Sequence, residues 1–267
     1  MGKVWRLIID SDGDGFYNMA EDEAIFSFYR KARIPTLRIY SWSNPFITLG
    51  YFQKPSKVLK IENLGKNKIE FTRRITGGFA ILHFYEITYS LSLSCKDLNL
   101  PRGVKDSYFV LTSFILNFYK RLGIKNIIFA HNLSNSSKNT NFCFASFEPY
   151  DILIEGKKIG GNAQYRRKEL IFQQGSIPLK LDFSLIEKLI NVKGPIETQG
   201  LGYFLNKELD KEGLKYRLAQ AFEEEFSINL TLSSLDDGEK KETKRLMEEK
   251  YTQRFWKFKN EEALLVK

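Results

Sequence analysis

The chain has 267 residues, of which 43% are hydrophobic, so it can build a sizeable core and is not of a disordered class. Its net charge of +9 favours acidic partners, but no Lys/Arg cluster is dense enough to indicate a nucleic-acid site. No apolar run approaches transmembrane length, and the N-terminus lacks a long apolar signal core, so we expect a cytoplasmic protein without a membrane partner.

Cysteine and histidine usage limits the metal and disulfide chemistry open to this chain. Cys95 and Cys143 show no metal-ligand spacing with the two histidines, His83 and His131, so we expect no metal site. A reducing compartment with free thiols is the expected setting. A single cysteine is commonly an inert, buried side chain. Composition alone therefore leaves Cys143 open as a nucleophile or as a packing residue.

The N-terminal part of the chain predicts a strand, a helix and then several short strands. Trp5–Asp10 has the apolar character of a strand. A helix follows over Met19–Tyr29, with Asn18 as the predicted N-cap and Glu21 as its reciprocal capping partner. Further strands are predicted over Thr36–Trp42, Phe46–Phe52, Lys68–Arg74 and Ile87–Ser94.

The remainder of the chain continues this mixture of strands and widely spaced helices. Helices are predicted over Asp106–Leu122, Phe183–Ile190 and Leu205–Phe226, and strands over Asn126–Ala130, Asp151–Glu155 and Glu169–Ile177. There is no strict βαβ alternation, no GxGxxG motif and no P-loop, which indicates an α+β fold. We expect a catalytic domain over residues 1–232 and a strongly charged C-terminal helical tail over 233–267 that docks by its aromatic end.

Two segments that combine glycines with cations stand out as candidate binding elements. The segment GKKIGGNAQ contains Gly156, Gly160 and Gly161, which permit tight turns and close approach of the backbone to a ligand. Lys158 lies among them, where a cation can hold a substrate carbonyl or lower the pKa of a thiol. An ordinary hairpin turn is the alternative interpretation of EGKK.

The second segment is RRITGG, residues 73–78. Its backbone amides could cradle an acyl carbonyl or a phosphate beside two guanidinium groups, and a β-turn with exposed arginines is the alternative. His83 follows shortly after and could act as an acid or base, although a single histidine at a strand end is more typical of a satisfied hydrogen-bonding residue. Glu86 and Asp151 show no paired-carboxylate spacing, and no Ser/His/Asp triad can be assigned.

Together these motifs resemble the lipoate–protein ligase/octanoyltransferase family, and within it the cysteine-dependent octanoyltransferase branch. The matching stretches follow the family's order along nearly the whole chain: WRLIIDSDGDGFYNMAEDEAI, SWSNPFITLGYFQ, RRITGGFAILHFYEITYS, CFASFEPYDILIEGKKIGGNAQYRR with QQGSI, and KYTQRFWKFKN. The resemblance implies a biotin/lipoate ligase-like domain, in which a mixed sheet is flanked by helices.

The resemblance also implies roles for individual residues. Cys143 falls on the acyl-accepting cysteine of the branch, and Lys158 falls on the lysine that holds the substrate carbonyl and favours the thiolate. The other expected substrate-binding residues lie in the two glycine-containing segments and are Arg73, Arg74, Gly77, Gly78, Phe79, Ala80, His83, Gly160, Gly161, Asn162 and Ala163.

The reaction implied is transfer of octanoyl from octanoyl-acyl carrier protein, through a cysteine thioester, to the lysine of a lipoyl-type domain. The acceptors of the family are the glycine cleavage H protein and the E2 subunits of 2-oxoacid dehydrogenases. No cofactor is expected. The main alternative is an ATP-dependent lipoate–protein ligase, which would need ATP and Mg²⁺. A lipoyl amidotransferase and a non-catalytic acyl- or carrier-binding protein are further alternatives.

Three positions depart from the family pattern. Phe79 replaces the third glycine of the loop, Phe84 replaces the acidic residue after His83, and Gln174 replaces the histidine of a Q-H-G-S motif. These changes are expected to affect substrate specificity more than the fold.

Overall fold

A computed structural model describes residues 4–130, 142, 150–192, 196, 198–206, 209–259 and 261. Its centre is a six-stranded mixed sheet. The strands, in spatial order, are β10 (Gly161–Arg167), β11 (Leu170–Pro178), β6 (Glu86–Ser94), β2 (Thr36–Trp42), β1 (Trp5–Gly13) and β12 (Leu230–Leu232). The pairs β12–β1 and β1–β2 are parallel, whereas β2–β6, β6–β11 and β11–β10 are antiparallel.

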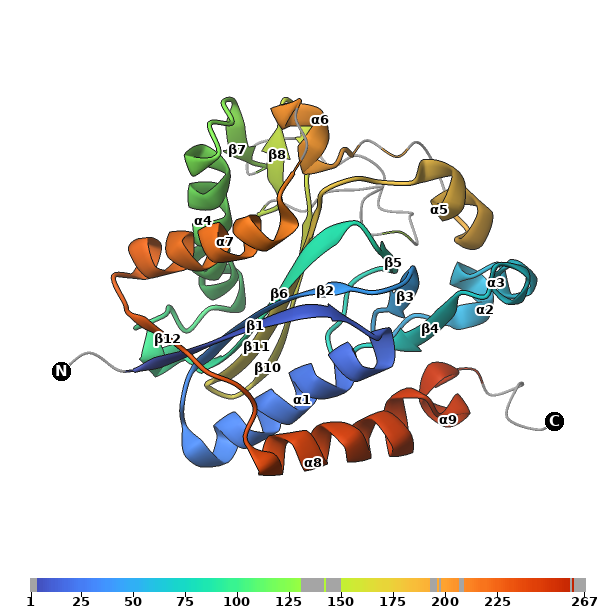
Figure 1. Ribbon diagram of the computed structural model, residues 1–267, viewed down its shortest axis with the longest axis horizontal. Helices are drawn as coiled ribbons and strands as arrows, with labels where there is room; N and C mark the ends of the chain where they lie inside the picture. The colour runs from blue at the N-terminus through green and yellow to red at the C-terminus, as the bar shows by residue number, and fades with distance from the viewer. Residues whose placement is uncertain are drawn as a thin grey trace.

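Helices cover both faces of this sheet. The long helices are α1 (Gly15–Ala32), α4 (Val104–Arg121), α7 (Lys211–Phe226) and α8 (Asp237–Leu246). Figure 1 shows α4 and α7 side by side over one face, and α1 and α8 side by side over the other. The expected α+β class, a mixed sheet flanked by helices, is therefore confirmed.

Two small sheets and several short helices complete the described part of the chain. One sheet has the order β4 (Glu70–Arg73), β3 (Phe46–Leu49), β5 (Ile81–His83), and the other has the order β7 (Ile127–Phe129), β8 (Ile152–Ile154), β9 (Lys157–Lys158). The short helices are α2 (Pro55–Val58), α3 (Ile61–Asn67), α5 (Phe183–Leu189), α6 (Leu201–Leu205) and α9 (Arg254–Lys257), with a 3₁₀ turn at Cys95–Asp97 and a π-helical turn at Met247–Tyr251.

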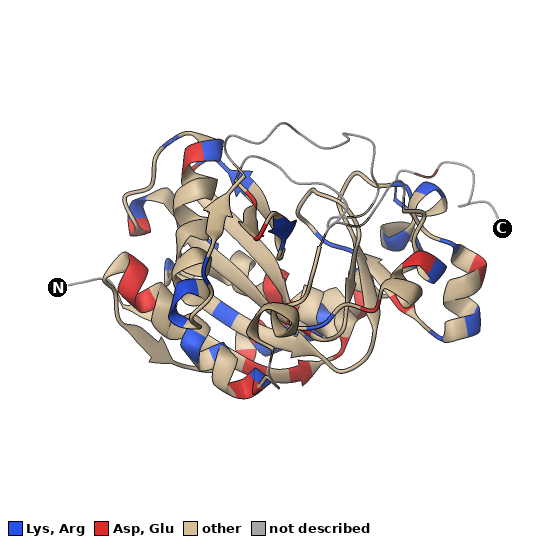
Figure 2. Cartoon of the chain, turned by 90° about the horizontal axis from the view of Figure 1, so that it is seen from above, with Lys and Arg blue, Asp and Glu red and all other residues tan. Residues whose placement is uncertain are grey.

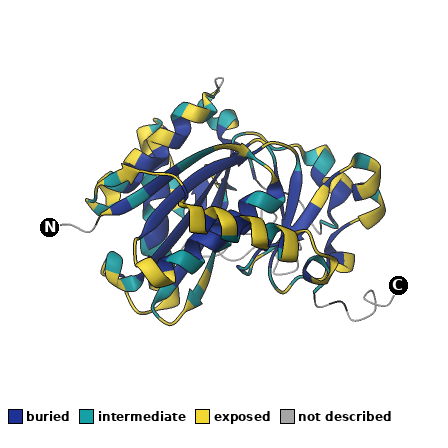
Figure 3. Cartoon of the chain, turned by 60° about the horizontal axis from the view of Figure 1, so that its bottom comes forward, coloured by how far each residue is buried: buried dark blue, intermediate teal, exposed yellow. Residues whose placement is uncertain are grey.

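Burial follows from this layering. Every residue of β6 is buried because helices cover both faces of the central sheet, and Figure 3 shows the strands buried and the helices partly exposed. The largest apolar cluster joins α4 and α7 to the sheet through side chains such as Phe114, Phe118 and Phe222. Figure 2 shows the charged residues mainly on the helices, with Lys and Arg interspersed among Asp and Glu. Among the described residues, no helix is both long and apolar enough to cross a membrane.

The first helix begins earlier than its sequence predicts. Asp14 is the N-cap, and its carboxylate accepts hydrogen bonds from the backbone N–H groups of Phe16 and Tyr17. The prediction that Asn18 caps the helix is wrong, because Asp14 supplies a side-chain acceptor one turn upstream. Asn18 is instead buried inside the helix, where its amide group donates to the Ser41 carbonyl.

The C-terminal segment from residue 233 packs against α1 through α8 and returns to β4 through α9. Its charged helix is largely solvated, as predicted, while Tyr251 and Trp256 are buried. Phe255, between them in sequence, is 56% exposed. The aromatic end of this segment therefore docks on the rest of the chain through Tyr251 and Trp256.

Candidate active site

A narrow cavity lies between α1, the central sheet and the segment that runs from β4 to β5. It brings together several residues of the expected binding set, namely Arg74, Gly78, His83, Gly161, Asn162 and Ala163. The rest of its lining comes from Met19, Tyr40, Ile81, Thr88, Gln174, Gly175 and Ser176. The wall is therefore part apolar and part polar, as a site for an acyl chain with a reactive carbonyl requires.

Arg74 holds the glycine loop, residues 77–79, in place. It is 1% exposed, and its Nη2 donates to the carbonyls of Gly77 and Phe79 at 2.9 and 2.7 Å. Gly78 has a φ of +88°, a conformation that favours glycine. A Cβ at Gly50 would lie 1.9 Å from the Gly78 carbonyl oxygen, so the neighbouring strand end must also be glycine. Both arginines of RRITGG are buried, which contradicts the alternative of exposed turn residues.

Arg73 serves a different part of the chain. Its guanidinium donates to the backbone carbonyls of Gly50, Tyr51 and Gln53 and to those of Trp256, Lys257 and Lys259. Burial lowers the pKa of Arg73 to about 10. Because the side chain is fully buried and committed to the main chain, we leave Arg73 out of the binding set proposed below.

His83 belongs to a buried polar cluster at the cavity wall. Its Nε2 lies 2.7 Å from Thr48 Oγ1, and its Nδ1 lies 2.7 Å from Glu86 Oε1. The imidazole ring stacks on Trp42 with a centroid separation of 3.9 Å. Glu86 also accepts hydrogen bonds from the hydroxyls of Thr88 and Ser176. His83 is thus a satisfied hydrogen-bonding residue that also lines the cavity.

Lys158 forms a buried ion pair with Asp151. Its Nζ lies 2.7 Å from Asp151 Oδ2, and both side chains are almost fully buried. The backbone carbonyl of Lys158 accepts a hydrogen bond from the Thr198 hydroxyl. EGKK does form a tight hairpin turn between β8 and β9, with Glu155 and Gly156 both at positive φ, as the alternative interpretation had it. Lys158, in the second strand of this hairpin, is nevertheless a buried cation and not a surface charge.

The backbone after Lys158 passes close to β11. Gly160 has a φ of +147°, and a Cβ there would lie 2.7 Å from the Ser176 carbonyl oxygen, so this close approach requires glycine. Gly161 follows and pairs with Ser176 at the start of β10. Asn162 is oriented by Tyr89, whose hydroxyl donates to Asn162 Oδ1 at 2.8 Å.

Cys143 lies outside the described residues. Phe142, which precedes it in the chain, is fully buried and forms a parallel β-bridge with Ala80, directly after the glycine loop. Gly77 borders a second, surface cavity. Phe79 is half-buried and does not line the narrow cavity, although its carbonyl is held by Arg74.

Several residues that build the site escaped the sequence analysis. Thr48 and Glu86 hold His83, Asp151 holds Lys158, and Ser176 reaches Glu86 across the sheet. The three-residue spacing of His83 and Glu86 was the one available signal for that pair. The other partners come from separate strands, so only the pairing of the strands brings them together.

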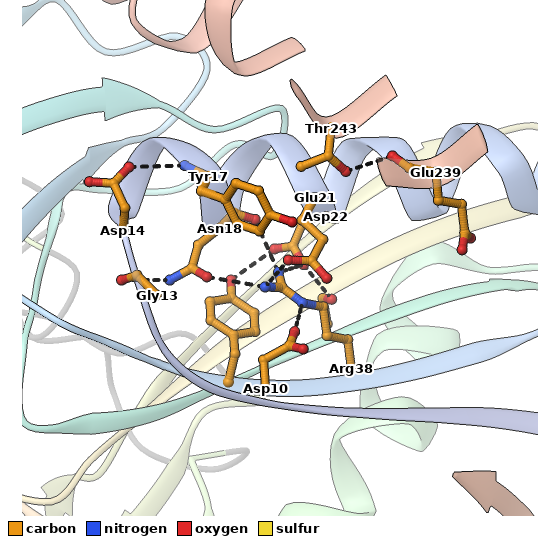
Figure 4. A network of polar contacts seen from close by, with 12 residues as sticks. Asp10, Gly13, Asp14, Tyr17, Asn18, Glu21, Asp22, Arg38, Glu239 and Thr243 are labelled. Carbon is orange, nitrogen blue, oxygen red and sulfur yellow. Dashed lines mark hydrogen bonds and ion pairs between the residues drawn. The ribbon is translucent and has the colours of Figure 1, made fainter. Parts of the chain in front are cut away.

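A second buried ionic cluster, centred on Arg38, holds α1 on the sheet beside the cavity (Figure 4). The guanidinium pairs with Asp10, Glu21 and Asp22 at 2.7, 2.7 and 2.9 Å. Asp22 also accepts from the hydroxyl of Tyr40, a cavity residue. Burial raises the pKa of Glu21 to about 7, since Arg38 offsets this effect only partly and the other two carboxylates add to it. By fixing α1, this cluster also fixes Met19 at the cavity wall.

Comparisons with known proteins agree with this architecture. Residues 14–222 match the model of the lipoyl protein ligase A/B catalytic domain. A protein named octanoyltransferase LipM, from Halalkalibacterium halodurans, is 33% identical over 275 residues, covering 96% of this chain and 99% of its own. The protein of the same name from Oceanobacillus iheyensis is 32% identical, covering 95% and 96%.

A solved structure supports the fold independently. It is described as a bi-partite lipoate protein ligase and its E2 lipoyl domain from Thermoplasma acidophilum, and it superposes with a TM-score of 0.76. The identity is 19%, and 96% of each chain is covered. The family match, which spans the helix, the glycine loop and the Lys158 segment described above, shows that this chain belongs to the lipoyl protein ligase A/B catalytic-domain family.

Proposed function

We propose that this protein is an octanoyltransferase that uses Cys143 as its nucleophile. It takes octanoyl from octanoyl-acyl carrier protein and passes it to the lysine of a lipoyl-type domain. The names of the full-length relatives support the activity. The observation that carries the site assignment is the bridge between Phe142 and Ala80, because it anchors the chain immediately before Cys143 beside the glycine loop.

The first step is a thioester exchange. The Cys143 thiolate attacks the carbonyl carbon of the octanoyl thioester, the bond to the carrier's sulfur breaks, and that sulfur leaves as a thiolate that takes up a proton. The thiolate is required because the protonated thiol is a much weaker nucleophile. In the second step the acceptor's lysine amine attacks the Cys143 thioester, the amide forms, the amine loses a proton, and Cys143 is released.

Lys158 is the proposed electrostatic partner of both steps. A buried ammonium stabilises a nearby thiolate and the negative charge that develops on the carbonyl oxygen. Asp151 holds this ammonium at 2.7 Å, so its position is set before substrate binds. Such fixed groups stabilise a transition state without the cost of reorganisation.

The narrow cavity is the proposed site for the acyl chain. Met19, Ile81 and Ala163 supply apolar surface for the methylene groups. Gly78 and Gly161 allow the backbone to approach the chain closely. The proposed binding set therefore keeps Arg74, Gly77, Gly78, Phe79, Ala80, His83, Gly160, Gly161, Asn162 and Ala163, with Arg74 acting on the loop and not on the substrate.

Both carriers are proposed to be acidic, which suits a chain with a net charge of +9 through faster encounter. The glycine cleavage H protein and E2 lipoyl domains are the proposed acceptors; a lipoate protein ligase of this fold has been solved with an E2 lipoyl domain. We place the reaction in the reducing cytoplasm, because the nucleophilic thiol must remain reduced.

Intact-mass measurement tests the proposal. The protein is incubated with octanoyl-acyl carrier protein in the absence of ATP, and its mass should rise by one octanoyl group in place of a proton. Cys143→Ser should abolish this acyl-enzyme, whereas Cys95→Ser should retain it. An adduct that survives in Cys143→Ser would overturn the assignment of the nucleophile.

A parallel assay separates transfer from ligation. A lipoyl domain is offered either octanoyl-carrier protein alone, or free octanoate or lipoate with ATP and Mg²⁺. We expect modification in the first reaction. Product in the second reaction alone would identify an ATP-dependent lipoate–protein ligase.

A further inference from the structure

Gln174 is a buried polar side chain whose amide has no partner among the residues that the structure describes. It is 8% exposed and lines the narrow cavity. Alternation along β11 places it on the same face as Ser176, whose hydroxyl reaches Glu86 at the cavity wall. Its amide makes no hydrogen bond to any residue that the structure describes, although an amide offers two donors and an acceptor.

The other polar side chains of the cavity differ from Gln174 in this respect. Arg74 is bonded to main-chain carbonyls, and His83 is bonded on both ring nitrogens. The remaining hydroxyls donate to carboxylates: Tyr40 to Asp22, and Thr88 and Ser176 to Glu86. The Asn162 carbonyl group accepts from Tyr89. The NH2 group of Asn162 makes no hydrogen bond to a described residue, but its carbonyl does, whereas neither end of the Gln174 amide is bonded within the described part of the chain. Gln174 therefore offers a ligand a complete amide group in this lining.

An unsubstituted octanoyl chain offers this amide nothing to bond with. Leaving a buried amide without a partner opposes binding, whereas a hydroxyl or oxo group on the chain would complete its hydrogen bonds. The site built around Gln174 therefore favours a chain that is apolar for most of its length and polar at one position.

We propose that, beside octanoyl, this protein accepts medium-length acyl chains that carry a hydroxyl or oxo group, and that Gln174 recognises this group. The inference rests on the proposed function, because it concerns the same acyl cavity. It assigns a substrate class and a specificity-determining residue, and it leaves the chemistry at Cys143 unchanged.

The pairing of the strands places the polar group along the chain and away from the reactive carbonyl. Gly161 pairs with Ser176, and Ala163 pairs with Gln174. The pair of Ala163 and Gln174 thus lies two residues further along β10 than the pair of Gly161 and Ser176, which is a distance of about 7 Å. Lys158, the proposed carbonyl-binding residue, precedes Gly161 by three residues in the sequence (161 − 158), whereas Ala163 follows it.

Binding measurements test the inference without relying on catalysis. The dissociation constants of octanamide and of 3-, 5- and 7-hydroxyoctanamide are measured by calorimetry for the wild type and for Gln174→Met, which keeps the side-chain length but removes the amide. In the wild type we expect at least one hydroxy compound to bind about 10-fold more tightly than octanamide, and in Gln174→Met we expect this difference in affinity to disappear. Gln173→Met, a change on the opposite face of the same strand, should keep the wild-type ratio.

The inference would be overturned if the ratio of the dissociation constants of the hydroxyoctanamides and octanamide were the same in the wild type and in Gln174→Met. Gln174→Leu serves as the second variant where Gln174→Met does not fold, and it carries the same expectation. The outcome is separable from that of the proposed function. Selective binding without any acyl-enzyme would sustain the role of Gln174 and refute transfer, whereas acyl-enzyme formation with equal ratios would refute only the role of Gln174.

Discussion

Arg73 and Arg74 are consecutive, both are fully buried, and yet they serve two different regions of the molecule. Arg74 donates to the carbonyls of the glycine loop and so shapes the cavity wall. Arg73 donates to the carbonyls of Gly50, Tyr51 and Gln53 and to carbonyls of the C-terminal segment, and it is not one of the residues that line the cavity. The comparison teaches that both guanidinium groups of this motif order main chain, one at the site and the other in the framework around it.

We propose the same division for the other buried ionisable pairs. Lys158 with Asp151 and His83 with Glu86 are assigned to the proposed site, whereas the Arg38 cluster is assigned to the framework that holds α1. Changes in the first set should lower the rate of acyl transfer. Changes in the second set should lower the free energy of unfolding while the folded molecules remain competent.

The largest effect on activity is expected at Lys158. Lys158→Met should slow acylation by about 10²–10³-fold, the loss seen when one transition-state donor is removed. It should also destabilise the fold, because Asp151 is left as a buried carboxylate without its cation. Rapid-quench acylation and urea unfolding measure the two effects.

The double variant Lys158→Met/Asp151→Leu separates these two effects. Replacing both members of a buried pair by apolar residues removes the unpaired charge, so stability should largely return. Acylation should remain slow, and Lys157→Met, at the neighbouring half-buried lysine, should change little. Recovery of acylation in the double variant would show that Lys158 acts only on the fold.

Arg73 and Arg74 provide the most direct test of the comparison. Arg73→Met should cost about 3–5 kcal/mol of unfolding free energy by leaving buried carbonyls without donors, and should expose the C-terminal segment to protease. Arg74→Met should cost a similar amount and also reduce the acylation rate of the folded protein. Arg245→Met, which removes exposed ion pairs with Glu242 and Glu249, should cost at most about 1 kcal/mol. Equal loss of acylation in the Arg73 and Arg74 variants would break the division into site and framework.

A smaller effect is expected from the titration of Glu21. Burial raises its pKa from 4.5 to about 7 in the folded protein, so the folded state binds the proton more tightly than the unfolded state does. The stability that this group contributes is present below pH 4.5 and is lost as the pH rises towards 7. The slope from this one proton is at most about 1.4 kcal/mol per pH unit.

Glu21→Gln should remove this contribution. The difference in unfolding free energy between the wild type and Glu21→Gln is measured from about pH 3 to 7.5, a range that covers both the rise of the Glu21 pKa above 4.5 and the fall of the Glu242 pKa below it. Glu242→Gln is the control of opposite sign, because hydrogen bonding to Arg245 lowers the pKa of Glu242 and its contribution is lost as the pH falls. If the difference in unfolding free energy between the wild type and Glu21→Gln did not change with pH, Arg38 would fully compensate for the burial of Glu21.

Much of the fold could be predicted because the strongest local patterns coincide with buried elements. Thr36–Trp42 was predicted as a strand with the observed bounds, and the helix predicted over Asp106–Leu122 is α4, shifted by one or two residues. The strand β10 was missed, since its sequence GNAQYRR lies at the sheet edge, is partly exposed and lacks apolar alternation. The start of α1 was misplaced because Asp14, one turn before Asn18, supplies the capping carboxylate.

Only those parts of the proposed site that lie in contiguous sequence motifs could be predicted. The glycine loop, His83 and the segment around Lys158 are contiguous in sequence, and a family resemblance could therefore identify them. Their partners Thr48, Glu86 and Asp151 are set by strand register and by the fold of the hairpin, which single-sequence patterns do not specify. Whether the Gln174 amide finds a hydrogen-bond partner depends on which neighbouring groups are already bonded to each other. Among the described residues, only the atomic contacts show this.

The smallest effect is expected at Phe79, the departure from the third glycine of the loop. The sequence predicted an effect of this change on substrate specificity, yet Phe79 is half-buried and absent from the cavity lining, while its backbone carbonyl is fixed by Arg74. Any effect on the acyl chain must therefore pass through the loop backbone. Phe79→Gly should shift the preference among six-, eight-, ten- and twelve-carbon donors by no more than one methylene, about 0.8 kcal/mol or roughly fourfold in acylation rate. Phe79→Leu, which keeps an apolar side chain and the backbone restriction, should retain the wild-type profile. A shift of two methylenes or more in Phe79→Gly would place the ring against the acyl chain and return this residue to the cavity wall.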